Sequence, residues 1–379
     1  MPGVSLPPRL RHAARLCTLT GALLLAAACT RGESPEVRTG VAPPPVSPPA
    51  GASRTDEELL PPPDRPGARA GIGTPGDTVD QAARAAADRA IAAAVARTGT
   101  VEAISLLGDS LRPTAMPAEA RRTQERLLAE AEAAYRRDAS ADALVWVGRR
   151  QAYLGRYREA IATFTRGIEQ YPRDARFYRH RAHRLLTIRQ TDAAIADFER
   201  AAALVAGQPD EVEPDGLPNA RGIPTSTLQS NIWYHLGLAR YLQRDFAGAL
   251  VAYDSGMRVS TNPDMRVAMA YWRHLTLRRL GRDAEAREAI AFVTPGMDII
   301  ENQAYYRLAQ LYKGDLTLAQ VAPAGAEALD DVSTAYGVGV WHLLEGRPAE
   351  AEATFRRIVA GGNWAAFAYI AAEAELAAR

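Results

Sequence analysis

The chain has 379 residues, of which 47% are hydrophobic and 23% are charged, and its formal net charge is +1. This composition is typical of a globular protein, and the length corresponds to two conventional domains or one extended array. The balanced charge, without a basic stripe interleaved with aromatic residues, argues against a nucleic-acid-binding protein. The two cysteines, Cys17 and Cys29, lie close to the N-terminus, so they offer no disulfide framework to the body of the chain.

The first 28 residues have the features of a targeting segment. Arg9, Arg11 and Arg15 precede an apolar run that extends from Leu16 to Ala28. This run is too short to cross ~30 Å of hydrocarbon as a helix, so it is typical of a signal peptide rather than of a membrane span. It ends in small residues directly before Cys29.

The stretch from Leu25 to Cys29 resembles the processing box of a bacterial lipoprotein, a short aliphatic and small-residue sequence that ends in cysteine. The resemblance implies that residues 1–28 are a signal peptide that is removed, and that Cys29 carries lipid. Several acyl chains on one cysteine would hold the protein stably on a membrane. Thr30 follows the cysteine instead of aspartate, which by the same resemblance implies the outer membrane, facing the periplasm. The alternative is an ordinary secretory signal without an anchor.

Residues 29–78 are rich in proline and glycine and poor in large apolar side chains. Such a segment buries too little apolar surface to offset its ordering entropy, so we expect a disordered, semi-extended tether. The sequence "GIGTPG" at 71–76 matches G-x-G-x-x-G, but a dinucleotide site needs a strand before this motif and a helix after it. A proline-rich tether precedes it here, so we expect no nucleotide site.

From residue 79 onward the pattern is helical. We expect N-terminal helices within 79–140, one of them alanine-rich and capped by Thr78 or Asp80, and another beginning at Pro117. No segment shows the alternating pattern of a convincing strand. The prediction for this region and everything after it is therefore all-α.

Residues 141–360 repeat one pattern of small and aromatic residues at intervals of 34 residues. Position 8 of each copy is glycine or alanine, position 20 is alanine, and position 24 is aromatic. In the three clearest copies these positions are Gly148, Ala160 and Phe164; Ala182, Ala194 and Phe198; and Gly237, Ala249 and Tyr253. We expect position 8 to meet position 20 where the two helices of a hairpin cross, because small side chains allow a close approach. The aromatic residue should project into the next hairpin.

Later copies of the pattern are looser. Residues around Gly281 and Ala286 form a fourth copy, and residues 305–312 carry the first helix of a fifth copy whose second helix is broken by Pro323. The segment from Val338 to Phe355 completes a sixth. Since one hairpin cannot bury both of its faces, neighbouring hairpins have to stack.

The pattern resembles the tetratricopeptide repeat, W-x₂-L-G-x₂-Y…A-x₃-F…P. The resemblance implies an all-α helix-hairpin solenoid, wound as a right-handed superhelix, over residues 141–360. Residues 361–379 would form a C-terminal helix that caps the last hairpin, although a protruding partner-binding helix is the alternative. Such solenoids bind extended peptides or partner helices on a concave surface lined by the first helix of each hairpin.

Positions 2, 5, 6 and 9 of each copy should face this concave groove. The predicted groove residues are basic, polar or aromatic: Arg149, Arg176, Arg179, His180, His183, Asn231, Tyr234, His235 and Tyr271, with Trp272 beside the last. Arginine forks bind carboxylates and aromatic rings receive apolar side chains, so the set suits an acidic or carboxylate-terminated peptide. It does not reproduce the lysine and asparagine clamp of chaperone-binding members of the family. The alternative is that these are ordinary solvated side chains.

Residues 205–230 interrupt the repeat, and their first half is acidic, with Asp210, Glu211, Glu213 and Asp215. Long loops inside compact arrays are usually functional or disordered. We expect the inserted loop to fold over the groove near Tyr234 and His235 as a lid or specificity loop; a loose surface insert is the alternative.

No catalytic signature is present in the sequence after Cys29: there is no H-E-x-x-H, G-x-S-x-G, P-loop or EF-hand loop, and no cysteine is left as a nucleophile. His180 and His183 share a helix face but have no third ligand, so we expect neither a metal nor another cofactor.

The predicted function is a non-enzymatic protein–protein interaction scaffold, lipid-anchored in the bacterial envelope and binding an envelope protein or peptide. Lipoproteins of this kind serve as adaptors for outer-membrane protein assembly, pilus secretion or peptidoglycan enzymes. The alternative is a binding protein that encloses a small molecule or short peptide under the loop at 205–230. The oligomeric state does not follow from the sequence.

Overall fold

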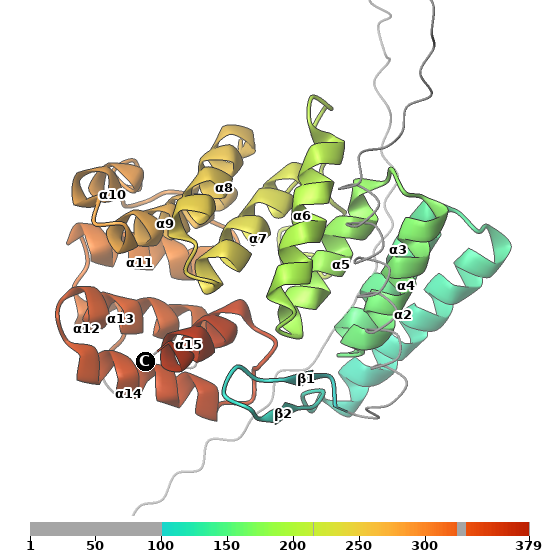
Figure 1. Ribbon diagram of the computed structural model, residues 1–379, viewed down its shortest axis with the longest axis horizontal. Helices are drawn as coiled ribbons and strands as arrows, with labels where there is room; N and C mark the ends of the chain where they lie inside the picture. Colours follow the sequence, from blue (N-terminus) through green and yellow to red (C-terminus); the bar gives the residue numbers. More distant parts are fainter. Residues whose placement is uncertain (1–100, 215, 324–330, 379) are drawn as a thin grey trace, which may run out of the picture. The chain divides into compact units, whose positions relative to one another are not determined.

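The computed structural model describes residues 101–214, 216–323 and 331–378. The predicted signal peptide, the lipidated Cys29, the tether and the alanine-rich helix after residue 79 lie outside these residues. Within them the chain is almost entirely helical (Figure 1). None of the described helices is both long and apolar enough to cross a membrane.

Successive helices pack as antiparallel hairpins (Figure 1). The paired helices are α3 (Ala141–Tyr153) with α4 (Tyr157–Gln170), α5 (Ala175–Thr187) with α6 (Thr191–Val205), α7 (Leu228–Leu242) with α8 (Phe246–Val259), α9 (Pro263–Arg279) with α10 (Asp283–Ala289), and α13 (Val332–Leu344) with α14 (Pro348–Ala360). Each hairpin also contacts the next along the chain, as α4 does α5 and α6 does α7. The prediction of an all-α helix-hairpin solenoid is confirmed.

The remaining helices extend this array. Helix α2 (Ala118–Arg137) packs on α3, and α11 (Gln303–Lys313) packs against both α9 and α13. The helix after α11 is only α12 (Leu318–Val321), which ends before Pro323 as the sequence predicted. Helix α15 (Phe367–Ala377) follows the last hairpin.

Several helices begin at side-chain caps that the sequence encodes. Thr227 and Ser230 form a reciprocal capping box at the start of α7. Asn262 accepts a hydrogen bond from Met265 N at the start of α9, where Pro263 occupies the first turn. These caps satisfy backbone N–H groups that have no partner within a helix, and they therefore fix where the two inner helices begin.

The hairpins close around aromatic rings. A Cβ atom added at Gly237 would lie 2.5 Å from Tyr253 Cε1, and one added at Gly148 would also collide with the ring of Phe164. Position 8 is therefore small because the aromatic residue at position 24 of the same hairpin lies against it. The side chain nearest to position 8 is this ring, a contact that the sequence analysis did not predict. All nine repeat positions named above are buried.

A short β-hairpin precedes the helices. Strand β1 (Ala103–Ile104) pairs antiparallel with β2 (Ser110–Leu111) through a turn at Gly108, whose φ is +97°. The sequence led us to expect only helices here. Two-residue strands are too short to show an alternating pattern, so sequence periodicity could not reveal them.

The C-terminal segment contacts both ends of the described array. Helix α15 packs against α13 and α14, and it also contacts α7. The ring of Trp364, just before α15, meets the ring of Tyr157 on α4 edge-on at 5.4 Å, and Phe367 lies 4.9 Å from His183 on α5. The last helix therefore covers part of the inner face of the first hairpins as well as the last hairpin.

Candidate functional site

Three adjoining cavities lie along the inner helices α3, α5, α7 and α11. The first, of about 270 Å³, is lined by Trp146, Arg149 and His180, and the second, of about 330 Å³, by Arg149, Arg179 and Asn231. The third, of about 500 Å³, is lined by Asn231, Tyr234, His235 and Tyr305 among others. The first and second share Arg149, and the second and third share Asn231, so the cavities follow one another along the inner face. We call them together the inner cleft.

The segment between α6 and α7 forms one wall of this cleft. Val212 and Thr227 make an isolated antiparallel bridge across its base, and Arg150 Nη1 on α3 donates to Gly216 O at 3.2 Å. Arg221 pairs with Asp298 at 2.7 Å. The described part of the inserted segment therefore packs on the inner helices through a set of polar contacts. Whether it works as a lid stays a prediction.

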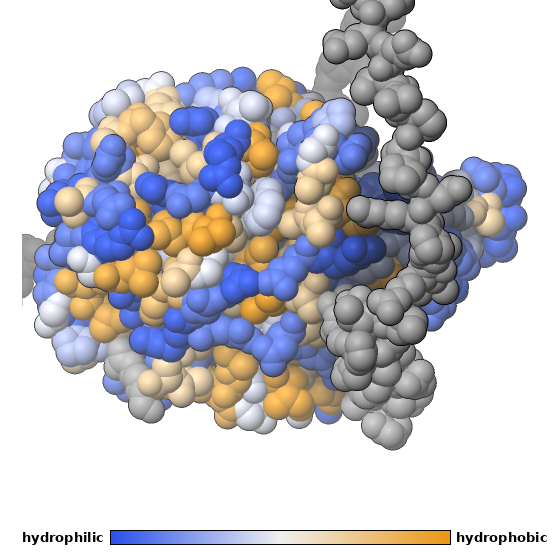
Figure 2. Space-filling model, turned by 45° about the horizontal axis from the view of Figure 1, so that its top comes forward, coloured by the Kyte–Doolittle hydropathy of each residue, from blue (hydrophilic) through white to orange (hydrophobic). Residues whose placement is uncertain are grey.

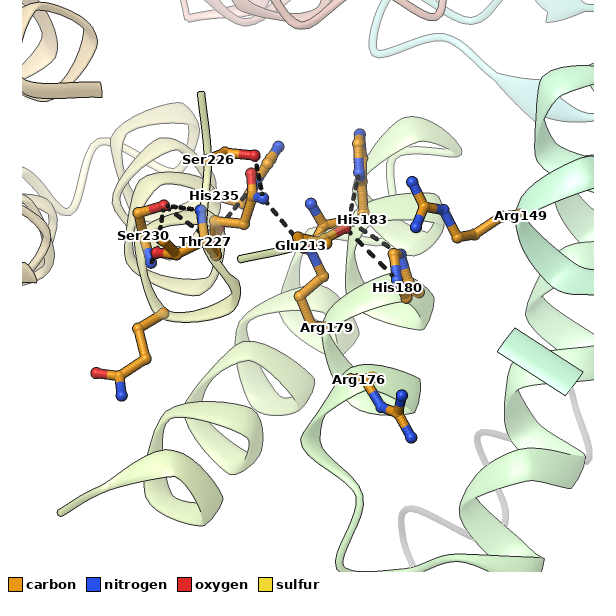
Figure 3. A network of polar contacts seen from close by, with 12 residues as sticks. Arg149, Arg176, Arg179, His180, His183, Glu213, Ser226, Thr227, Ser230 and His235 are labelled. Atoms are coloured by element: carbon orange, nitrogen blue, oxygen red, sulfur yellow. Dashed lines mark hydrogen bonds and ion pairs between the residues drawn. The ribbon is translucent and has the colours of Figure 1, made fainter. Parts of the chain in front are cut away.

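Arg179 on α5 is the centre of the polar network at the middle of the cleft (Figure 3). Its Nε lies 3.1 Å from Glu213 Oε2, and its Nη1 donates to His180 Nδ1 at 3.0 Å. Nη1 also lies 3.4 Å from His183 Nδ1. Because a guanidinium only donates, the Nδ1 atoms that face it have to accept, so both imidazoles are neutral with the proton on Nε2.

Burial keeps the cleft histidines uncharged. Desolvation, with the positive charge of Arg179 nearby, holds the pKa of His180 well below its ordinary 6.5, and burial does the same to the pKa of His183. Burial lowers the pKa of His235 to about 3. His235 Nδ1 lies 2.6 Å from Asn231 O and donates to it. The fixed charges of the cleft are therefore those of its arginines and carboxylates.

Two arginines near the polar network lack an ion pair among the described residues. Arg149 donates to Tyr153 OH at 3.2 Å and lies over the ring of Trp146, but it has no carboxylate partner among the described residues. Burial lowers the pKa of Arg184 to about 10, and its guanidinium lies 5.7 Å from the Tyr157 ring centre. In the described part of the chain Arg184, too, has no ion pair. Of the arginines that line the first two cavities, Arg176 and Arg179 are paired with carboxylates and Arg149 is not.

The third cavity has an aromatic wall. The hydroxyl groups of Tyr234 and Tyr305 lie 2.9 Å apart, and Trp272 Nε1 donates to Tyr234 OH at 3.0 Å. Tyr271 stacks on Tyr305 with ring centres 4.9 Å apart. Tyr271 is fully buried, so it supports this wall from behind rather than lining the cavity. Burial raises the pKa of Tyr234 well above its ordinary value, so its hydroxyl stays protonated.

Most of the residues predicted to face the groove come together in the inner cleft. Those that line it or contact its network are Arg149, Arg176, Arg179, His180, His183, Asn231, Tyr234 and His235. Arg176 is already paired with Asp142 and Asp174, and Tyr271 lies in the core instead of the cleft. That these residues bind a partner stays a prediction.

Sequence reasoning missed the residues that reach the cleft from distant segments. Glu213 belongs to an acidic stretch that the sequence singles out, but nothing local shows that it pairs with Arg179. Tyr305 and Phe367 arrive from α11 and α15. The excess of arginine at the inward positions was the one available signal, since it calls for an acidic partner somewhere in the fold.

The residues that the structure describes contain no group of three side chains suited to hold a metal ion. His180 and His183 both direct Nδ1 at the Arg179 guanidinium, which repels a cation. On the face shown in Figure 2, hydrophobic residues form separate patches with hydrophilic residues between them.

No family model and no curated protein matches the chain. Among solved structures, the chain is similar to YrrB, a TPR protein with an unusual peptide-binding site, with 14% identity and a TM-score of 0.35 over 61% of this chain and 91% of that one. It is also similar to a tetratricopeptide repeat protein from Parabacteroides merdae, with 13% identity and a TM-score of 0.40 over 68% of this chain and 98% of that one. Likenesses as distant as these carry no argument about function, and the fold rests on the hairpin packing described above.

Proposed function

We propose that the chain is a non-enzymatic protein-interaction scaffold that binds an extended peptide or a partner helix in the inner cleft. The observation that carries the proposal is the continuity of the three cavities along the first helices of successive hairpins. A peptide laid along this path would meet the Arg149–Arg179 region at one end and the Tyr234–Tyr305 wall at the other. Binding an elongated segment needs such a succession of subsites rather than one enclosed pocket.

The chemistry of the cleft supports an acidic or carboxylate-terminated segment as the partner. Arg149 has no carboxylate partner among the described residues, and a guanidinium in a partly desolvated site binds a carboxylate in a planar, bidentate manner. The neutral histidines add hydrogen-bonding groups. Because they are uncharged, they do not compete with the arginines for the partner's carboxylate. Tyr234 and Tyr305 offer ring surface for an apolar side chain of the same segment.

The proposed location is the outer membrane of a bacterium, with Cys29 lipidated and the scaffold facing the periplasm. The support is the sequence alone: the segment that ends at Cys29 and the Thr30 that follows it. In cells that process lipoproteins, the Cys29→Ser variant should move from the membrane fraction to the soluble fraction. If the wild-type and variant chains fractionate alike, lipid anchoring at this cysteine is excluded.

The test of the scaffold proposal is site-specific photo-crosslinking in the intact chain. A photoreactive amino acid replaces Gln303, which lines the third cavity, or Ala353, which is exposed on the outer helix α14. We expect one discrete partner to crosslink at position 303 and not at 353, and the Arg149→Gln substitution to reduce this yield at least tenfold.

A matched control uses Arg173→Gln, which removes the same charge from an exposed position outside the cavities. This variant should leave the crosslink unchanged. A crosslink that appears equally at 303 and 353, or that both arginine variants reduce equally, would place the partner elsewhere on the surface.

The third cavity also fits a second function, the enclosure of a small molecule or short peptide under residues 225–226. Its volume of about 500 Å³ lies within the ~300–1,000 Å³ range of small-ligand sites. A metabolite that raises the melting temperature of wild-type protein, but not of the Tyr234→Ala variant, would favour this function over the scaffold.

A further inference from the structure

Glu213 is a carboxylate supplied by the connecting segment to a site built by the inner helices. Its Oε2 lies 3.1 Å from Arg179 Nε and accepts a hydrogen bond from Asn231 Nδ2 at 3.0 Å. Its Oε1 lies 3.6 Å from His180 Nε2. The side chain is almost fully buried, and Figure 3 shows it lying toward Arg179 and His180. Two helices, α5 and α7, therefore converge on one carboxylate.

The segment that carries Glu213 is held to the body mainly by polar contacts. Its large apolar side chains point to solvent: Val212 is 61% exposed, Leu217 is 59% exposed and Ile223 is 44% exposed. Asn219 donates to Glu301 Oε1 at 2.7 Å farther along the segment. Segments that bury little apolar surface open at low free-energy cost. Lifting this one would disrupt mainly polar contacts, because Val212, Leu217 and Ile223 are already about half exposed.

Glu213 does not satisfy both arginines of the second cavity, and Glu301, the other carboxylate that lines it, accepts from Asn219 and Thr225 instead. Arg179 Nε is buried and lies within ion-pair distance of Glu213, yet it makes no hydrogen bond. Arg149 borders the same cavity and, unlike Arg179, has no carboxylate partner among the described residues. A carboxylate that entered between Arg149 and Arg179 would satisfy both guanidiniums and keep the hydrogen bond from Asn231.

We propose that Arg149, Arg179 and Asn231 form a carboxylate-binding site that Glu213 fills in the free protein, and that the carboxylate of an acidic partner segment displaces it. Glu213 thus competes with the partner's carboxylate for the same site. A partner segment binds only when its carboxylate displaces Glu213 and the short segment that carries it. The inference rests on the proposed function in one respect, the assignment of the displacing carboxylate to a partner. The site itself can be tested without a partner.

The experiment uses the full chain and a peptide with the sequence of residues 209–214, Pro-Asp-Glu-Val-Glu-Pro, which carries a fluorescent label. Substituting Glu213→Ala empties the site, so the peptide should bind the variant in trans. In the wild type the tethered Glu213 competes at an effective concentration in the millimolar range. We expect at least tenfold tighter binding to the variant, measured by fluorescence anisotropy, and at least tenfold weaker binding of a peptide with glutamine in place of its second glutamate.

The matched control is Glu211→Ala, which removes an exposed carboxylate from the same segment. This variant should bind the peptide no better than the wild type. Equal binding to all three proteins, or no binding to the Glu213→Ala variant, would overturn the carboxylate site.

Hydrogen exchange on the Glu213→Gln variant keeps the inference testable if the alanine variant fails to fold. Faster exchange confined to residues 211–226 would support a displaceable segment. Equally faster exchange in α5 and α7 would show that Glu213 is a structural ion-pair partner and would overturn the proposal. If instead the peptide binds in trans while the crosslinking at Gln303 finds no partner, the scaffold function fails and the carboxylate site stands.

Discussion

Arg189 and Glu373, which are 184 residues apart in the chain, form a buried two-pronged ion pair. Arg189 Nε donates to Glu373 Oε2 and Nη2 donates to Oε1, both at 2.9 Å. The Arg189 side chain is 4% exposed and that of Glu373 is fully buried. Nη2 also donates to Trp364 O at 2.9 Å. The pair joins the end of α5 to α15, and so joins the first half of the described array to its last helix.

Removing one partner of this pair should destabilise the fold strongly. The Glu373→Gln substitution keeps the size of the side chain but leaves the Arg189 charge buried without a counter-ion. We expect the free energy of unfolding to fall by about 3–5 kcal/mol, the usual consequence of breaking a buried pair. Urea denaturation monitored by circular dichroism measures it.

An exposed pair provides the control. Arg126 and Glu130 lie 2.6 Å apart on α2, with more than half of each side chain in water. The Glu130→Gln substitution should change the free energy of unfolding by less than about 1 kcal/mol. A Glu373→Gln effect no larger than that of Glu130→Gln would mean that α15 does not depend on the buried pair.

A single methyl group should disturb the hairpin of α7 and α8. In the Gly237→Ala variant the new Cβ lies 2.5 Å from Tyr253 Cε1, and the Tyr253 side chain is fully buried with no room to withdraw. Alanine gains about 1 kcal/mol of helix propensity over glycine. Overpacking costs about 1–3 kcal/mol. We expect a net loss of stability of up to about 2 kcal/mol in the same urea assay.

Two further variants decide whether the collision causes this loss. Gly362→Ala places its Cβ in open space, so it should change the stability by less than about 0.5 kcal/mol. Adding Tyr253→Leu to Gly237→Ala should make the glycine substitution favourable, because the ring that it strikes is gone. An unchanged penalty in the leucine background would contradict the packing argument.

A buried aspartate fixes the backbone that leads into α11. Both Asp264 oxygens accept from Ile300 N, and Oδ1 also accepts from Glu301 N and Asn302 N, at 2.8–3.1 Å. The Asp264→Asn variant replaces one accepting oxygen with a donor and removes the charge. We therefore expect a loss of about 1–3 kcal/mol in the free energy of unfolding, measured by urea denaturation.

The half-buried Asp254, which pairs with Arg273 at 2.6 Å, supplies the comparison. Its substitution Asp254→Asn should cost less than about 1 kcal/mol. Similar losses at both positions would contradict the role of Asp264 as a buried backbone cap.

Much of the fold could be predicted because the repeat is a local packing code. Small and aromatic residues recur at the positions where helices touch, so hairpin after hairpin follows from residues close together in sequence. The repeat pattern also predicts that Pro323 breaks the second helix of the fifth copy. The pattern could not predict that α15 returns to α5, since that contact depends on Arg189 and Glu373, whose pairing has no local signature.

The site could be predicted in part for the same reason. Helical spacing alone shows that Arg149, Arg179 and Tyr234 share the inner face. It does not show which of them end buried, because burial here comes from Glu213 and Phe367, which reach the face from a loop and from the last helix. The electrostatic character of the cleft was therefore accessible from the sequence, whereas its internal pairing was not.

Two buried histidines should make the protein less stable in mild acid. Burial lowers the pKa of His235 to about 3 and that of His274 to about 4, from an ordinary 6.5. The unfolded chain therefore takes up protons first as the pH falls below 6.5, so the stability is complete above that pH and is lost below it. At about 1.36 kcal/mol per pH unit and group, the two account for about 4 kcal/mol between pH 7 and pH 5.

Urea denaturation at both pH values measures the loss. The matched variant is the double substitution His235→Asn/His274→Asn, whose amides can still donate to the carbonyls of Asn231 and Ala286. It shares all other titrating groups with the wild type. Its loss of stability between pH 7 and pH 5 should therefore be smaller by about 4 kcal/mol. An unaltered pH dependence in the double variant would show that these imidazoles titrate alike in the folded and unfolded chain.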